Sequence, residues 1–491
     1  MSFSLNNFYA RWRRHSGAVP TLREGADPPP EQLLQSIWQQ QRLRRDQLTT
    51  FDGQPVRILH PGFLSREGGP DFRAAVIQFG NHPPVSGDVE LDIVAGGWKA
   101  HGHDRNPKFK SVVLHAVWQA PTRPAAGPPL VALHGKLDAP LAELAEWLGG
   151  EGVPGLPEEF RGRCAAPLCE LGDDALQQLL QQAALVRLRG KASQFAARAR
   201  EAGWEQSLWE GLFRALGYKH NPWPMQRLAE LRPRWQSKSA DAVSLQSRLL
   251  GIANLLPTEL TRAQIEADAH LRQLWDGWWR ERDAYEDCVL PRSLWRLHGI
   301  RPVNHPQRRL ALAAHWLADG KLVTSLERWA TAPCDDRRKR TSRRQVSELA
   351  AVLQPAPDEF WSRHLTLRSR RSAKPQLLLG DARVTDLAMN AVLPWLWARA
   401  AEGNEASLTD NLQTAYLMWP AGEDNSVLKL ARQRLLGAAS EKDFNTASAQ
   451  QGLLQIVRDF CDRSNAICDH CRFPELVKAW GMEPHSASPQ R

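Results

Sequence analysis

The hydrophobic pattern changes its period once along the chain, and this change limits the folds that the sequence can adopt. Between residues 54 and 137, short apolar segments are separated by Gly, Pro and Asn, which is typical of strands. From about residue 139, apolar residues recur with helical spacing almost to the end of the chain. The pattern predicts an α+β protein with a small N-terminal mixed α/β unit and a large, mainly α-helical region. The predicted strands cover residues 54–62, 72–80, 87–94, 110–120 and 129–137.

The length of 491 residues suggests two to four packed units. Three consecutive prolines before Glu31 end an N-terminal arm, and the apolar spacing after them predicts a helix over 31–48. The predicted organisation is a flexible arm (1–30), an α/β domain (31–138), a helical domain (139–330), a basic linker (331–345), a C-terminal helical region with a cysteine cluster (346–480) and a tail (481–491).

The sequence contains no run of about 18 to 20 apolar residues of the kind that crosses a bilayer, and its first residues lack a signal-peptide core. We therefore expect a cytoplasmic protein without a membrane partner. The seven cysteines are odd in number and scattered, so reduced thiols or metal ligands are expected rather than a disulfide framework.

The chain carries a formal charge of +9, and positive charge is concentrated in one short segment. Six of the eight residues between 337 and 344 are basic, which favours nucleic acid as a partner. The residues concerned are Arg337, Arg338, Lys339 and Arg340. A solvated loop without a partner is the alternative. Most of the 20 tryptophans are expected in the core, with a few available for base stacking.

A second candidate for nucleic-acid binding surrounds a proline-bounded helix start. Arg301, Arg308 and Arg309 lie there, where guanidinium groups and helix N-terminal amides would suit a phosphate. Alternatively, Arg301 bonds a carboxylate of the α/β unit and the prolines form a rigid turn.

The segment 87–94 alternates acidic and apolar residues, so as a strand it would place all its carboxylates on one face. Their mutual repulsion is unfavourable unless a cation offsets it, and Mg²⁺ or Mn²⁺ prefers such oxygen ligands. The apolar face would pack on a helix. The acidic residues are Asp88, Glu90 and Asp92, and the apolar ones are Val89, Leu91 and Ile93.

The Pro-Asp pair at 70–71 immediately precedes a strand that could pair with the acidic one. The predicted order is a helix, a strand, a strand that begins at Pro-Asp, a strand with a Glu and a further strand. This order resembles the core of the PD-(D/E)XK nuclease superfamily, in which an Asp and a Glu bind the metal and a Lys assists. The resemblance implies metal ligation by Asp71 and Glu90 and a metal-dependent nuclease or phosphodiesterase acting on nucleic acid. On this hypothesis we expect Asp88 to be an auxiliary ligand. The position of the lysine is taken by Asp92. Lys99, His101 and His103 are the candidate substitutes, with both histidines on one side if their segment is extended.

Three alternatives remain for this region. The segment containing His101 and His103 could be a rigid loop whose side chains bond backbone groups. The protein could instead be a zinc hydrolase, with both histidines and an Asp or Glu as ligands. It could also be a non-catalytic nucleic-acid-binding or scaffold protein with a degenerate nuclease-like core. His115, within an apolar strand, is expected to be a core residue outside the site.

Cys461, Cys468 and Cys471 have a C-x6-C-x2-C spacing, and the tight C-x2-C pair suits zinc or an iron–sulfur cluster. The spacing resembles the cluster loop of the endonuclease III family of DNA glycosylases, although Val477 stands where the fourth cysteine would fall. The candidate fourth ligands are His470, His485, Cys164 and Cys169. Three reduced thiols without a metal are the alternative.

Longer segments together resemble a bacterial family known only as a domain of unknown function, DUF2851. They include residues 58–80, 87–118, 212–224 and 294–316, together with the cysteine-bearing tail. The resemblance extends over most of the chain and implies a bacterial cytoplasmic protein, but it implies no activity. The oligomeric state is not predictable from the sequence.

Overall fold

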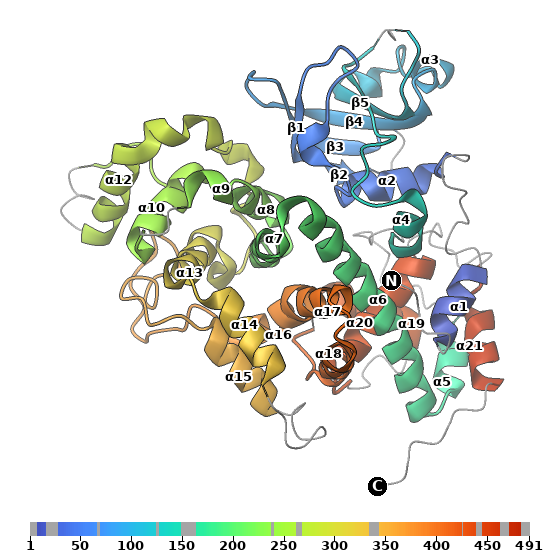
Figure 1. Cartoon of the computed structure of the whole chain (residues 1–491). Helices are drawn as coiled ribbons and strands as arrows, with labels where there is room; N and C mark the ends of the chain where they lie inside the picture. The colour runs from blue at the N-terminus through green and yellow to red at the C-terminus, as the bar shows by residue number, and fades with distance from the viewer. Residues whose placement is uncertain are drawn as a thin grey trace. The chain divides into compact units, whose positions relative to one another are not determined.

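The computed structural model describes residues 7–15, 28–65, 69–123, 127–148, 164–236, 240–261, 268–332, 343–424, 426–437, 444–461 and 471–482. The chain divides into two compact units (Figure 1). Unit 1 contains Met1–Ala197 and Gln413–Arg491, and unit 2 contains Arg198–Leu412. The N-terminal sheet and the large helical region confirm the predicted mixed α/β class.

Unit 1 contains a six-stranded sheet with the order β1-β3-β4-β5-β6, in which β2 also pairs with β3. The β1–β3 and β3–β4 pairs are antiparallel, whereas β4–β5 and β5–β6 are parallel. All five strands predicted from the sequence are confirmed, and β2 was not predicted. The strands are β1 Val56–His60, β2 Phe63–Leu64, β3 Phe72–Phe79, β4 Val85–Val94, β5 Val112–Gln119 and β6 Leu130–Ala132.

Helix α2 (Glu31–Gln39) packs its apolar stripe on one face of this sheet (Figure 1). Leu34 and Trp38 of the helix share a buried cluster with Val89 and Leu91 of β4, which confirms that the apolar face of the acidic strand packs on a helix. The helix is shorter than the predicted 31–48. It ends where Gln41 adopts a left-handed backbone conformation (φ 52°), and a short 3-10 turn, η1 Arg45–Gln47, follows.

The other helices of unit 1 come from both ends of the chain, and most of them share a second buried cluster. Tyr9 of α1 donates a hydrogen bond to the buried Asp459 carboxylate (2.7 Å), which also faces Arg13 (3.0 Å). This cluster therefore joins residues that lie far apart in the sequence. The helices are α1 Phe8–His15, α3 Gly97–Ala100, η2 Pro107–Phe109, α4 Leu141–Trp147, α5 Ala165–Glu170, α6 Asp173–Ala202, α18 Ala406–Met418, α19 Ser426–Leu436, α20 Ala447–Ile456, η8 Val457–Cys461 and α21 Phe473–Met482; α6 and α18 cross the unit boundaries.

The regular elements of unit 2 that the structure describes are all helices or helical turns, as the apolar spacing predicts, while residues 354–380 form a long connection without a helix. Its elements are α7 Trp204–Leu216, α8 Pro222–Glu230, α9 Arg232–Trp235, α10 Ala242–Ile252, α12 Ala269–Glu281, η3 Arg282–Cys288, η4 Arg292–Leu294, η5 Pro302–Asn304, α13 Pro306–Asp319, α14 Leu322–Thr331, α15 Arg343–Leu353, α16 Asp381–Leu387, η6 Ala388–Val392 and α17 Leu393–Glu402.

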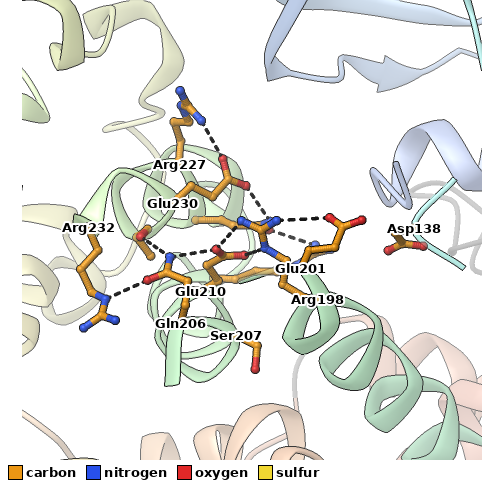
Figure 2. A network of polar contacts seen from close by, with 12 residues as sticks. Asp138, Arg198, Glu201, Gln206, Ser207, Glu210, Arg227, Glu230 and Arg232 are labelled. Atoms are coloured by element: carbon orange, nitrogen blue, oxygen red, sulfur yellow. Dashed lines mark hydrogen bonds and ion pairs between the residues drawn. The ribbon is translucent and has the colours of Figure 1, made fainter. Parts of the chain in front are cut away.

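A polar network fixes the first helices of unit 2 to one another (Figure 2). Arg198 donates two hydrogen bonds, both 2.9 Å long, to the carboxylate of Glu210 on α7. Gln206 donates to the same carboxylate and to the Ala229 carbonyl of α8. Burial and the Glu230 charge raise the pKa of Glu210, and the Arg198 contacts oppose this effect. The groups that make these hydrogen bonds lie on α6, α7 and α8, so the network stabilises the packing of these helices on one another.

Among the described residues, none of the helices combines the length and apolar character that crossing a membrane requires.

Candidate metal centre

Strand β4 presents two buried carboxylates on the face opposite the α2 core. Glu90 and Asp92 are each 7% exposed, whereas Val89 and Leu91 point into the apolar cluster. The predicted alternation of faces is therefore confirmed at these positions. Because β4 pairs with strands on both sides, its two carboxylates lie over the interior of the sheet rather than at an edge.

The segment after β4 folds into a turn of helix, and His101 and His103 follow it. The segment is not extended, which was the condition under which the sequence placed both histidines on one side, since α3 ends at Ala100 and Gly102 adopts a positive φ of 72°. Glycine has no Cβ and takes this conformation without strain. The rings of His101 and His103 lie on one side even so, with centroids 5.4 Å apart. The His103 ring is fixed by stacking on Phe109, with centroids 4.0 Å apart and planes 10° from parallel.

Asp92, His101 and His103 converge on one point. Each offers one ligand atom, and these atoms all lie within 4.8 Å of one another. His101 Nδ1 is 3.4 Å from Asp92 Oδ1. Two imidazoles and one carboxylate are a common ligand set for zinc and other divalent transition metals. This group is a candidate metal centre.

His103 carries a buried polar atom that is not satisfied by the protein. Its Nδ1 makes no hydrogen bond with any described residue, although Glu90 Oε1 lies 3.5 Å away. A buried nitrogen in this state costs free energy, and a bound ligand would offset that cost. Burial lowers the pKa of His103, which favours the neutral imidazole that metals bind.

The environment of Asp92 holds its carboxylate in one orientation. His115 on the neighbouring β5 places Nε2 2.9 Å from Asp92 Oδ2. On the other side, Gly97 lies so close that an added Cβ would stand 2.4 Å from Asp92 Oδ1. Carboxylate ligands of metals are typically positioned by such outer contacts. His115 is buried and hydrogen-bonded, as predicted for a core residue. It nevertheless contacts Asp92, although it was expected to lie outside the site.

Asp71 and Glu90 form a second, adjoining carboxyl pair. The Asp71 N–H donates to Glu90 Oε2 (3.1 Å), while Asp71 accepts from the Leu91 N–H (3.0 Å) and from Gln35 Nε2 (2.9 Å). Burial raises the pKa of Glu90 to about 9, with further increases from the Asp71 and Asp92 charges. Burial likewise raises the pKa of Asp71 to about 7. The two residues lie together at the β3–β4 hairpin, where the sequence places them.

Two further predicted site residues lie outside the converging group. Asp88 is a neighbour of Glu90 along β4, but its carboxylate accepts from Ser111 Oγ (2.5 Å) and from the Ala74 N–H (3.1 Å) at an irregularity in β3. These contacts give Asp88 a role in strand pairing, and its role as an auxiliary ligand stays a prediction. Lys99 is exposed on α3.

The arginines predicted to bind nucleic acid separate into exposed and buried ones. Arg308 and Arg309 are only 1% and 3% exposed, and both donate to carbonyl oxygens of the segment 361–378. The structure corrects their predicted role, since guanidinium groups enclosed by carbonyls are not available to phosphate. Arg301 is exposed. The basic residues 337–340 lie outside the described residues.

The cysteine cluster is only partly described. Cys461 and the suggested fourth ligand Cys164 are buried in the same apolar cluster, and Cys471 packs against it. Cys468, His470 and His485 lie outside the described residues, and Cys169 is exposed. A zinc or iron–sulfur site at these cysteines stays a prediction.

Sequence reasoning did not name Asp92 among the candidate ligands, although the strand alternation places it on the same face as Glu90 and the zinc-hydrolase alternative left the third ligand open to an Asp or Glu. The nuclease motif has a lysine where this chain has Asp92, so the resemblance makes Asp92 a departure from the motif and not a candidate ligand. No pattern of consecutive residues indicates that His115 and Gly97 lie against Asp92, because both reach it through the tertiary structure.

The fold and this site define a mixed α/β and helical protein with a candidate metal centre on its sheet. The model of the family described as Protein of unknown function (DUF2851) matches residues 31–426. The chain belongs to this family, which confirms the predicted membership. No curated protein and no solved structure matches the chain.

Proposed function

We propose that the protein is a metal-dependent hydrolase whose divalent transition metal, such as zinc, is held by Asp92, His101 and His103. The convergence of these three side chains carries the proposal, and the unsatisfied buried Nδ1 of His103 supports it. A metal of this kind lowers the pKa of bound water to about 7 and so supplies a nucleophile at neutral pH.

Glu90 is the general base of the proposed reaction. Its Oε1 lies 3.5 Å from His103 Nδ1, so it would be placed beside a metal held by that histidine and could accept a proton from water there. A cation at this position favours the ionised carboxylate and opposes the burial that raises the pKa of Glu90 in the metal-free protein. Asp71 positions Glu90 through its backbone N–H.

The proposed substrate is a phosphodiester of nucleic acid. The histidine-bearing segment 99–110 contains four basic residues and one acid, and Lys99, Arg105 and Lys110 are all exposed. Cations beside a hydrolytic metal favour an anionic substrate. The resemblance of Asp71 and Glu90 to a nuclease carboxylate pair supports the same substrate class.

That resemblance also suggests a second metal arrangement, with Mg²⁺ or Mn²⁺ on Asp71 and Glu90. The observation that favours it is the hydrogen bond from the Asp71 N–H to the Glu90 carboxylate, beside which the Asp71 charge lies close enough to raise the pKa of Glu90. The two arrangements differ in the metal that they select. Imidazoles favour zinc, whereas carboxylates alone favour Mg²⁺ or Mn²⁺.

Asp92→Asn and its neighbour Asp88→Asn provide a matched test. Metal content is measured after purification and after incubation with zinc, and hydrolysis is measured with bis(p-nitrophenyl) phosphate and labelled oligonucleotides. Asp92→Asn should lose one equivalent of metal and the activity, whereas Asp88→Asn should keep both. If both variants bind metal like the parent, the three-residue centre is wrong. Loss of activity in Glu90→Gln with Mg²⁺ but not with zinc would favour the second arrangement.

A non-catalytic nucleic-acid-binding protein is the other candidate function. The observation that favours it is Asp92 at the position where the nuclease resemblance expects lysine. Salt-sensitive binding without hydrolysis under any of the metals, unchanged in Glu90→Gln, would support this candidate over the hydrolase.

A further inference from the structure

Unit 2 contains two segments that lack acidic residues and lie side by side. Residues 211–229 and 288–318 contain no Asp or Glu. Asn221, only 2% exposed, joins them by donating to the Arg296 carbonyl (3.0 Å) and accepting from the Arg296 N–H (2.8 Å). Because both hydrogen bonds use the backbone of Arg296, its side chain is not needed for this connection.

The first segment presents an aromatic ring with a guanidinium group over it. Tyr218 is 38% exposed, and Arg383 Cζ lies 3.9 Å from its ring centroid. The Tyr218 backbone has a positive φ of 53°, which is rare for a bulky residue and is commonly retained at binding sites. The turn before it is tightly packed, since a Cβ on Gly217 would stand 2.2 Å from the Asn221 carbonyl oxygen. The ring is therefore held by a rigid turn.

Positive charge surrounds this ring. Lys219 and Arg296 are exposed. Lys219 and His220 directly precede Asn221, whose two hydrogen bonds to the Arg296 backbone bring Arg296 to the same turn. Burial and then the charges of Arg296 and Lys219 lower the pKa of His220. Arg383 pairs with Asp386 (2.7 Å), so part of its charge is already compensated. We name this region the Tyr218 surface and define it by Tyr218, Lys219, His220, Arg296 and Arg383.

We propose that the Tyr218 surface binds single-stranded nucleic acid. An exposed ring stacked with arginine accepts an unpaired base, and the adjacent cations contact the phosphates on either side of it. A duplex hides the faces of its bases and would use only the cations. The choice of ligand rests on the proposed nucleic-acid substrate, whereas the binding itself requires neither the metal nor Glu90.

A second exposed aromatic residue of unit 2 provides a control. Trp279 is also 38% exposed, and Arg282 Cζ lies 3.6 Å from its ring centroid. Its sequence surroundings are of mixed charge, however: Asp276, Glu281 and Asp283 lie beside Arg280 and Arg282. A polyanion should gain less from this surface than from the Tyr218 surface, although the aromatic geometry is similar.

The experiment measures fluorescence anisotropy of labelled oligothymidine and oligouridine of about 20 nucleotides, longer than the usual site size for such proteins. The full chain is used in EDTA so that no strand is cleaved. We expect Tyr218→Ala and Lys219→Ala/Arg296→Ala each to weaken binding at least tenfold, with Trp279→Ala unchanged. The double variant should also reduce the salt dependence, by about 1.4 in the slope of log K against log salt for two lost phosphate contacts.

Three outcomes of the single-strand measurements would overturn this proposal. They are unchanged binding in the Tyr218 and double variants, equal weakening by Trp279→Ala, and absence of binding by the parent chain. Duplex DNA bound as tightly as single strands, with no effect of Tyr218→Ala, would reduce the surface to a charge patch and also contradict it. Circular dichroism verifies the fold of each variant. Hydrolysis of bis(p-nitrophenyl) phosphate tests the metal centre separately, so the two proposals can fail independently.

Discussion

His115 Nε2 lies 2.9 Å from Asp92 Oδ2, and the other carboxylate oxygen of Asp92 lies 3.4 Å from His101 Nδ1. Asp92 thus connects a buried strand residue with an exposed loop residue. The register of the parallel β4–β5 pair, in which Glu90 faces His115, brings this histidine to the site. An oriented carboxylate binds a metal more tightly than a mobile one, since less conformational freedom is lost on binding.

The first prediction removes the hydrogen bond of His115 while keeping a ring of similar size. His115→Phe should weaken metal affinity by 10- to 100-fold, the range typical for loss of an outer contact to a ligand. Affinity is measured by competition with a chromophoric chelator. His134→Phe, an exposed histidine of the same unit, is the control and should leave affinity unchanged. Equal affinities for all three proteins would show that His115 does not position Asp92.

The second prediction uses the close approach of Gly97 to Asp92. Gly97→Ala places a methyl group 2.4 Å from the carboxylate in the present geometry, so the carboxylate must move. We expect metal affinity to fall at least tenfold while circular dichroism stays unchanged. The control is Gly96→Ala, because nothing lies within 4 Å of the added Cβ at that position. If both variants bind metal equally well, the position of Asp92 does not determine affinity.

Local pattern predicted the strands of the sheet and the two faces of β4, because alternation is a property of consecutive residues. The proximity of Asp71 and Glu90 was expected from the resemblance to a nuclease core together with the spacing, which suits a hairpin. The approach of His115 could not be predicted, since it depends on which strands are neighbours and in what register. The helical turn of α3 also escaped prediction. Two histidines spaced by one residue suit a strand, and only the positive φ of Gly102 brings them together after a helix.

The arginines at 301–309 illustrate a different limit. Sequence shows basic residues at a helix start, which suits a phosphate, but it does not show that a segment more than 50 residues later supplies carbonyl oxygens to the same groups. Arg308 donates to the carbonyls of His364 and Leu377, each at 2.8 Å. Burial lowers the pKa of Arg308, because removing the guanidinium group from water disfavours its charged form. The contacts with the carbonyl oxygens offset this desolvation cost.

The third prediction follows from this enclosure. Arg308→Met should destabilise the protein by about 3 kcal/mol or more, because several buried carbonyls lose their donor at once. Arg328→Met, at an exposed position of α14, should change stability by less than about 0.5 kcal/mol. Urea unfolding measured by circular dichroism compares the two. A small effect at Arg308 would mean that water replaces the guanidinium group and that the segment 361–378 does not depend on it.

The last prediction concerns pH and rests on His60 at the end of β1. This side chain is 8% exposed, and its Nδ1 accepts a hydrogen bond from the Gly62 N–H (3.0 Å), which requires the nitrogen to be unprotonated. Gly62 has a φ of 93° and its Cβ position is crowded by Phe72, so the turn that holds this N–H is fixed. Burial lowers the pKa of His60 to about 4.

The pKa of His60 is about 4 in the folded state and about 6.5 in the unfolded state. The neutral imidazole therefore stabilises the fold fully above about pH 6.5, and this stability is lost as the pH falls toward 4. At pH 5 the loss amounts to about 2 kcal/mol. His60→Asn keeps an acceptor for Gly62 but does not titrate. Between pH 7.5 and 5, the parent should therefore lose about 2 kcal/mol more stability than this variant in urea unfolding. All other titratable groups are shared, so an equal loss in both proteins would mean that His60 is protonated without disturbing the turn.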